Sequence, residues 1–203
     1  LLHDVVGLRS DKDGADILRK EARMFNKLDR IICHNEKMRT ALQNAGCTAR
    51  CSLLGPFDYL CSDFQPADRG MGRTVVIAGN LSREKSGYIY ALRQVENMQF
   101  NLYGLNYEGE STQNIKYCGK YAPEDLVKVL EGNFGLVWDG DSLETCTGTY
   151  GEYLRYNNPH KFSLYLAAGL PLIVWSQSAL APYVEKHGLG LCVDSLLDLE
   201  NIR

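Results

Sequence analysis

The sequence predicts an α/β fold built from two consecutive Rossmann-like domains, each with a parallel sheet. Short apolar runs alternate with amphipathic stretches along most of the 203 residues, and this alternation is typical of parallel α/β sheets. A polar stretch with one proline and two glycines, residues 62–73, interrupts the alternation, which then restarts. We therefore expect the end of one domain over residues 1–65 and a second domain over residues 66–203.

The first domain is expected to contain a helix, a strand and a second helix. Residues 14–28 carry apolar side chains at helical spacing with charges opposite, and residues 29–34 form a short apolar run typical of a buried strand. Asn35 is a favoured N-cap for a helix over residues 36–45. Gly46 would end that helix, because glycine readily adopts the left-handed conformation found there.

The second domain is expected to alternate strands and helices to its end. Strands are predicted over residues 74–80, 100–104, 134–139, 170–175 and 190–193, and helices over residues 87–95, 124–130, 160–168 and 178–186. Ligands of doubly wound sheets bind beyond the carboxyl ends of the strands. This rule selects the loops after Gly79, Tyr103 and Asp139 and the loop that leads into His160.

Composition and charge argue against several classes of protein. The formal net charge is −3, whereas nucleic-acid-binding domains usually carry a basic face. The longest apolar stretch, residues 162–175, is short and interrupted by Gly169 and Pro171, so no membrane span is expected. The seven cysteines lack zinc-site spacing, and several lie in apolar runs. We therefore expect reduced thiols and a cytoplasmic location.

The segment most informative for chemistry opens the helix expected at residue 160. Pro159 is a favoured first helical residue, and the N–H groups and dipole of a helix start attract anions. Lys161 adds a positive charge that opposes the dipole, so local stability gives little reason for it. A bound diphosphate would supply that reason, and an ordinary surface lysine is the alternative.

Two other loops allow more than one interpretation. Residues 79–86 follow a strand and carry Arg83 and Lys85, but they contain no phosphate-loop pattern, so an ordinary loop is the simpler interpretation. Asp139 and Asp141 form an Asp-x-Asp sequence that could bind a metal. A turn, or contact with sugar or ribose hydroxyls, is favoured instead, because Asp and Gly are preferred in turns. We expect no metal site.

Histidines offer only weak candidates for acid–base chemistry. His3 and Asp4 lie together near the start and are the candidates for a general base. His34 and His187 are interpreted as structural histidines. No nucleophile elbow is present, so hydrolase chemistry has no support.

Eight segments together resemble one enzyme family. They are, in order, HDVVGLR, DRIICHNEKMRTALQNAG, FDYL, AGNLSREKS, NLYGL, KYCGKYAPEDL, EGNFGLVWDGDS and GEYLRYNNPHKFSLYLAAGLPLIVWSQSALAPYVEKHGLGL. The pattern is similar to the bacterial glucosyltransferases that extend the glycans of serine-rich repeat adhesins, often labelled galactofuranosyltransferase-like. The match runs through nearly the whole chain.

This resemblance implies a GT-B fold, in which two Rossmann-like domains face each other across a cleft. It also implies metal-independent transfer of a hexose, expected to be glucose, from a UDP-sugar to a glycan acceptor, expected to be N-acetylglucosamine on a glycoprotein. The UDP-sugar is a substrate, so no cofactor is expected, and homo-oligomerisation is left open. Two alternatives stay open: a UDP-sugar epimerase of the same fold, and a non-catalytic partner subunit of a glycosyltransferase complex.

The resemblance also assigns residues to the donor site. These are Asn80, Ser82 and Arg83 after the first strand of the second domain, Tyr117 or Tyr121 near the uracil, and Asn158, His160, Lys161 and Ser163 around the diphosphate. The family's opening strand, first glycine-rich loop and final crossing helix have no counterpart in these residues. The first, acceptor-side domain is therefore expected to be incomplete, and the chain to be a piece of a longer protein.

Overall fold

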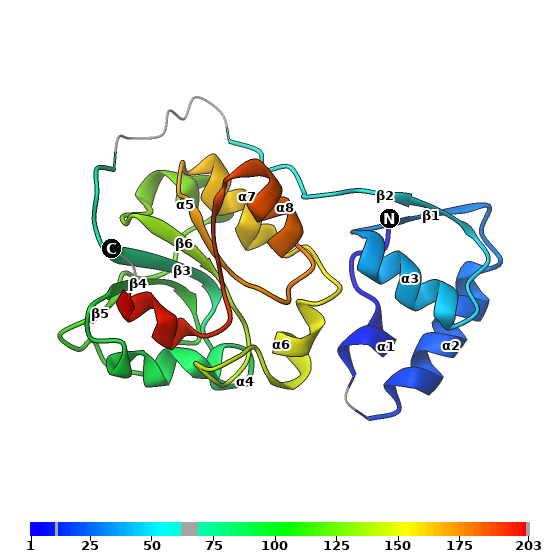
Figure 1. Ribbon diagram of the computed structural model, residues 1–203, viewed down its shortest axis with the longest axis horizontal. Coiled ribbons are helices and arrows are strands. Elements are labelled where there is room, and N and C mark those ends of the chain that lie inside the picture. The colour runs from blue at the N-terminus through cyan, green and yellow to red at the C-terminus, as the bar shows by residue number, and fades with distance from the viewer. Residues whose placement is uncertain (11, 62–68, 202–203) are drawn as a thin grey trace.

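The computed structural model describes residues 1–10, 12–61 and 69–201. They form two units, which we call the N-terminal unit (up to residue 61) and the C-terminal unit (from residue 69), and these lie next to each other in Figure 1. Residues 62–68 hold most of the expected joint and the boundary expected between residues 65 and 66. Both therefore fall largely outside the described residues.

The N-terminal unit is small. Its elements are α1 (Val6–Arg9), α2 (Gly14–Phe25), β1 (Arg30–Cys33), α3 (Glu36–Asn44) and β2 (Arg50–Leu53). The two strands pair in parallel, from Arg30 opposite Arg50 to Cys33 opposite Leu53. The expected helix cap is confirmed, because Asn35 Oδ1 accepts a hydrogen bond from the Met38 N–H at 3.0 Å.

The C-terminal unit is a six-stranded parallel sheet between two layers of helices. Its elements are β3 (Thr74–Asn80), α4 (Arg83–Ser86), the 3₁₀ helix η1 (Gly87–Gln94), β4 (Gln99–Leu105), β5 (Ile115–Tyr117), α5 (Pro123–Val129), β6 (Phe134–Val137), α6 (Gly148–Tyr153), α7 (His160–Ala167), β7 (Leu172–Trp175), α8 (Ala181–His187), β8 (Gly190–Val193) and η2 (Leu196–Asn201). The expected parallel α/β sheet is thereby confirmed.

The strand order locates a binding crevice. The order is β5-β4-β3-β6-β7-β8, with all neighbours parallel. The chain first builds outward from β3 to one side and then returns to build from β6 to the other side. The topological switch point therefore lies between β3 and β6, and ligands of such sheets bind outside the carboxyl ends of the strands at this point.

The helices α5, α7 and α8 cover one face of this sheet, and α4, η1 and η2 cover the other (Figure 1). The core between them contains large side chains with under 2% exposure, among them Trp138, Trp175, Tyr88 and Tyr165. Tyr165 approaches the sheet closely, since a Cβ on Gly135 would lie 2.2 Å from its ring. Its hydroxyl accepts a hydrogen bond from the Ala78 N–H at 2.7 Å, which fixes the end of β3 beside the switch point.

Two helices differ from their predicted form. The helix predicted over residues 87–95 is the 3₁₀ helix η1, and the short α-helix α4 precedes it. The Tyr88 N–H donates to the Gly140 carbonyl at 3.1 Å instead of forming an α-helical bond, so a tertiary contact sets the geometry here. Pro159 was expected to be the first helical residue, but it is the N-cap, with extended backbone, and α7 begins at His160.

Two expectations from the sequence concern the state of the cysteines and the presence of a membrane-spanning helix. None of the seven cysteines is in a disulfide in the described parts of the chain, and Cys33, Cys47 and Cys146 are buried. Burial raises the pKa of the Cys33 and Cys146 thiols well above the ordinary value, so these groups stay protonated. Among the described residues, no helix combines the length and the apolar character needed to cross a bilayer.

Candidate functional site

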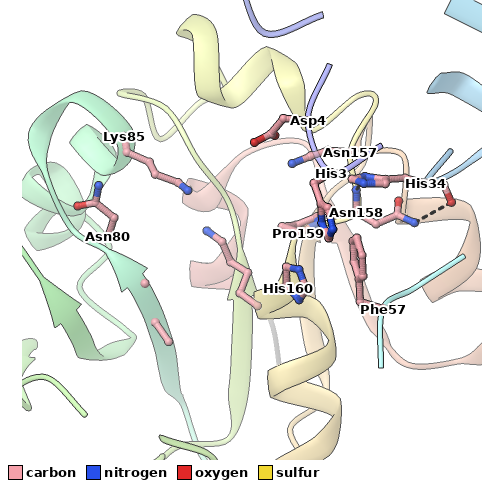
Figure 2. A pocket seen from close by; sticks show the side chains of 13 residues that line it. His3, Asp4, His34, Phe57, Asn80, Lys85, Asn157, Asn158, Pro159 and His160 are labelled. Atoms are coloured by element: carbon pink, nitrogen blue, oxygen red, sulfur yellow. Dashed lines mark hydrogen bonds between the residues drawn. The ribbon is translucent and has the colours of Figure 1, made fainter. Parts of the chain in front are cut away.

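A cavity of about 390 Å³ lies between the two units, at the carboxyl end of β3 (Figure 2). Five segments that are distant in sequence line it. The N-terminal unit contributes His3, Asp4 and His34, the segment after β2 contributes Phe57, β3 and α4 contribute Ala78, Gly79, Asn80 and Lys85, and the start of α7 contributes Asn157, Asn158, Pro159, His160 and Lys161. The cavity therefore coincides with the switch point of the sheet.

Lys161 is held in a buried ion pair. Its Nζ donates to Asp139 Oδ1 at 2.7 Å and to the Trp138 carbonyl at 2.9 Å. The two charged side chains are only 13% and 6% exposed, respectively. Lys161 is therefore not an ordinary surface lysine, and the fold gives a reason for this cation that the sequence did not show, because it neutralises the buried Asp139 carboxylate. An ammonium group has three protons, so one is still available to an anion in the cavity.

Lys85 is the second cation of the cavity. Figure 2 shows its side chain directed into the cavity from α4, and its Nζ lies 5.6 Å from the centroid of the Tyr150 ring. This lysine lies in the segment expected to be a loop after β3 but was not among the residues expected at the donor. A cation directly after the central strand of a doubly wound sheet was the signal that could have found it.

The three residues that were assigned from this loop are placed differently from one another. Asn80 lines the cavity, and its Oδ1 accepts hydrogen bonds from the Ser82 N–H at 3.1 Å and from Asn106 Nδ2 at 2.9 Å. Ser82 precedes α4 and does not line the cavity. Arg83 is directed elsewhere, since its guanidinium lies 3.9 Å from the centroid of the Tyr90 ring and 3.6 Å from the Glu108 carboxylate.

A second cavity of about 520 Å³ adjoins the first, and Gly79 lines both. It lies over the carboxyl end of β4, and Tyr103, Gly104, Leu105, Lys120, Tyr121, Ala122 and Leu126 complete its lining. Tyr121 therefore faces this space. Tyr117 does not, because its hydroxyl donates to the Gly104 carbonyl at 2.9 Å from outside the lining. The structure thus favours Tyr121 of the two tyrosines expected near a base.

Asn158 and Ser163 contact the N-terminal unit. The Asn158 amide Nδ2 donates to the carbonyls of His34 and Gly55 at 3.1 and 2.7 Å, and Ser163 Oγ donates to the Phe57 carbonyl at 2.5 Å. Ser163 does not line the cavity. The polar groups of both residues are thus engaged by protein, which differs from their expected role at the diphosphate.

An aromatic wall joins the two units at the mouth of the cavity. Phe57 stacks on His160, with ring centroids 4.2 Å apart, and on His3, with centroids 6.1 Å apart. Asp4, beside His3, is exposed and lies 3.3 Å from the Arg9 guanidinium. The structure therefore brings His3 and Asp4 to the same cavity as Lys161, although more than half of the chain separates them.

His34 is buried, as expected of a structural histidine. Its Nδ1 accepts a hydrogen bond from the Asn158 N–H at 3.1 Å, so its neutral form carries the proton on Nε2. Burial is the main cause that lowers the pKa of His34 below its ordinary value, and charge on His3 and His160 acts in the same direction. The Leu2 backbone and the Asp4 carboxylate act in the opposite direction.

The Asp-x-Asp sequence has protein partners on both carboxylates. Asp139 is paired with Lys161, and Asp141 accepts a hydrogen bond from the Thr147 hydroxyl. Within the described ranges, no three side chains of His, Cys, Asp or Glu are grouped so that they could hold a metal ion. Asp139 does not line the cavity, and its side chain is only 6% exposed.

Comparison with family models matches both units. Residues 75–203 match the C-terminal domain of glucosyltransferase 3-like proteins, and residues 1–55 match the N-terminal domain of the same proteins. The chain is 39% identical over 206 residues to the beta-1,6-galactofuranosyltransferase WbbI of Escherichia coli, covering 100% of this chain and 59% of WbbI. It is 30% identical over 185 residues to glucosyltransferase 3 of Streptococcus gordonii, covering 88% and 52%. The chain thus spans less than two thirds of these curated relatives.

Solved structures show the same fold. A TarM variant from S. aureus, in complex with Fondaparinux, alpha-GlcNAc-glycerol and UDP, has a TM-score of 0.56 at 12% identity, covering 95% of this chain and 41% of that one. A GtfA/B complex has a TM-score of 0.50 at 13% identity, covering 88% and 36%. This similarity confirms the expected GT-B arrangement of two α/β units.

Proposed function

The chain belongs to the glucosyltransferase 3-like family, and from this premise we propose that it forms the substrate-binding cleft of a metal-independent glycosyltransferase. The reaction transfers a hexosyl group from a UDP-sugar to a glycan acceptor. One observation carries the proposal most directly. The cavity at the switch point presents Lys85 and Lys161 on its C-terminal side and His3 and Asp4 on its N-terminal side.

The cationic side of the cavity suits a diphosphate. The first N–H groups of a helix lack intrahelical partners, and α7 begins at His160, within the lining. As the glycosidic bond breaks, negative charge grows on the departing UDP. Lysines and helix N–H groups that are already in place stabilise this charge without reorganisation, which is the role that a metal plays in other transferases.

The adjoining cavity suits the nucleoside. It shares Gly79 with the diphosphate cavity, so one extended ligand can occupy both. Its lining is mainly apolar and includes the ring of Tyr121, on which a uracil can stack. This assignment makes Tyr121, rather than Tyr117, the base-binding tyrosine.

The N-terminal side supplies the groups that face the acceptor. An attacking sugar hydroxyl must lose its proton, and a base needs to lie within hydrogen-bond reach of it. His3 and Asp4 are exposed at the cavity and are the candidates that we retain for this role. Phe57 forms an aromatic wall with His3 and His160, and a sugar ring can lie against this wall.

The identities of the transferred sugar and of the acceptor are a more specific part of the proposal. Glucose was the expected hexose and N-acetylglucosamine on a glycoprotein the expected acceptor, and both stay predictions. The relative from Escherichia coli is named for transfer of galactofuranose, so a galactofuranosyl donor must be tested beside UDP-glucose. A cytoplasmic location also stays a prediction, and homo-oligomerisation stays open.

The test uses the full-length protein. Calorimetry with UDP, followed by product analysis with each donor in the presence and absence of a glycan acceptor, should show UDP binding and acceptor-dependent transfer. Conversion of the UDP-sugar without acceptor would identify an epimerase instead. Donor binding without any turnover across a panel of acceptors would identify a non-catalytic subunit, and absence of UDP binding would overturn the proposal altogether.

A further inference from the structure

Asn158 sits at the centre of a hydrogen-bond network between the two units. The residue is only 2% exposed. Its Nδ2 donates to the carbonyls of His34 and Gly55, at 3.1 and 2.7 Å, and the first of these bonds is dashed in Figure 2. Its Oδ1 accepts from Asn35 Nδ2 at 2.8 Å, and its N–H donates to His34 Nδ1 at 3.1 Å. All four bonds cross from the C-terminal unit to the N-terminal unit.

Asn35 completes this network from the other side. Its Nδ2 donates both to Asn158 Oδ1 and to the Tyr156 carbonyl, at 2.8 and 2.7 Å. Its Oδ1 meanwhile caps α3. We call His34, Asn35, Gly55 and Asn158 the interdomain latch.

The latch leaves Asn158 no donor for a ligand. An amide nitrogen has two protons, and both are used by carbonyls of the N-terminal unit. Asn158 nevertheless lines the cavity together with its neighbours on each side, Asn157 and residues 159–161. The latch therefore holds the turn before α7 at a fixed place relative to the N-terminal unit, and so fixes the separation of the two sides of the cavity.

We propose that Asn158 is a positioning residue that, through the interdomain latch, sets the distance between the donor side and the acceptor side of the cavity. This inference rests on the proposed function. The donor contacts lie within the C-terminal unit, whereas transfer also needs the groups of the N-terminal unit. Loss of the latch therefore lowers kcat while UDP affinity is retained. A misplacement of about 1 Å reduces rates by roughly 100-fold in enzymes that depend on such alignment.

Two variants remove the latch from opposite sides. Asn158→Ala deletes the central amide. Asn35→Asp is the sharper test, because its carboxylate still accepts from the Met38 N–H and so keeps the cap of α3. It replaces the nitrogen that donates to Asn158 and Tyr156 with a carboxylate oxygen, which repels both acceptors.

Asn114 offers a matched control. It is also buried, at 8% exposure, and its Nδ2 also donates to two carbonyls, of Leu92 and Val95, at 3.2 and 3.1 Å. Its Oδ1 also accepts from a side chain, the Thr112 hydroxyl, at 3.0 Å. All of these partners lie within the C-terminal unit. Asn114→Ala therefore reproduces the loss of stability without releasing the latch.

The experiment measures kcat, KM for the donor, UDP affinity and small-angle scattering on the full-length proteins. We expect both latch variants to lower kcat by roughly 10- to 100-fold with unchanged UDP affinity, and to increase the radius of gyration. Asn114→Ala should change neither kcat nor scattering.

Two outcomes would overturn the positioning role. One is an unchanged radius of gyration and kcat in folded Asn35→Asp. The other is a parallel loss of UDP affinity in Asn158→Ala, which would make Asn158 a ligand. If the wild-type protein neither binds UDP nor transfers sugar, the proposed function fails. The radii of gyration of the wild-type protein and the latch variants then decide by themselves whether the latch holds the two units together.

Discussion

Substitutions in the ion pair of Lys161 and Asp139 should separate the contribution of this lysine to folding stability from its contribution to UDP binding. The pair is nearly removed from water, with side-chain exposures of 13% and 6% and an Nζ–Oδ1 distance of 2.7 Å. Lys161→Met leaves the Asp139 carboxylate buried without a cation. Breaking such a pair from one side costs about 3–5 kcal/mol of folding free energy.

The double variant Lys161→Met/Asp139→Leu removes both charges. Replacing a buried ion pair with apolar side chains of similar volume is often neutral for stability, so the double variant should recover most of the loss. UDP affinity should not recover, because no charge-assisted hydrogen bond to the diphosphate is left. That bond is worth about 1.5–3 kcal/mol, which corresponds to a loss of affinity of roughly 10- to 100-fold.

Urea denaturation and calorimetry with UDP, on full-length single and double variants, give the two quantities independently. Stability that returns in the double variant while affinity stays low would establish both roles. A double variant that binds UDP as tightly as wild type would show that Lys161 serves the fold alone, and the diphosphate assignment would then be wrong.

Four further outcomes are expected. Lys85→Ala should weaken UDP binding by about tenfold or more, and less so at high salt, because the lost interaction is ionic; calorimetry at two salt concentrations checks this. Tyr121→Ala should weaken UDP binding by roughly 1–3 kcal/mol without affecting pyrophosphate binding, whereas Tyr117→Phe should leave both unchanged. Transfer should persist in excess EDTA, and activity that returns only with manganese or magnesium would contradict metal independence. Because burial lowers the pKa of His34, the unfolded chain binds more protons between that lowered pKa and the ordinary value of 6.5. The free energy of unfolding should therefore fall as pH drops through this window and level off below it, and His34→Gln should remove this step in urea denaturation.

Most of the larger sheet could be predicted because most of its strands are apolar runs. β3 and β8 begin and end where the sequence predicts. The strands that were not predicted, β2 and β5, have four and three residues and carry polar or charged side chains. Their extended form depends on pairing with neighbours in the sheet, which a local pattern does not contain.

The site was predicted in its location and less well in its contacts. Of the four loops that the rule for doubly wound sheets selects, those after Gly79 and Tyr103 and the one before His160 line the two cavities, whereas the loop after Asp139 does not. The choice between Arg83 and Lys85 could not be made from spacing, because it depends on where each side chain points. Arg83 lies over the Tyr90 ring, and Lys85 is directed into the cavity.

The turn before α7 shows why its residues could not be assigned individually from the sequence. Asn158 has partners 103, 123 and 124 residues away, all on the other unit, while Lys161, three positions later, contacts Asp139 beneath the cavity. A helix start attracts anions wherever it occurs, so local pattern predicts a binding turn but not which side chains face the ligand. One short segment therefore meets the other unit at Asn158 and the cavity at Lys161. Positioning and binding are thus adjacent in sequence but separable by substitution, since Asn35→Asp changes the first and Lys85→Ala the second.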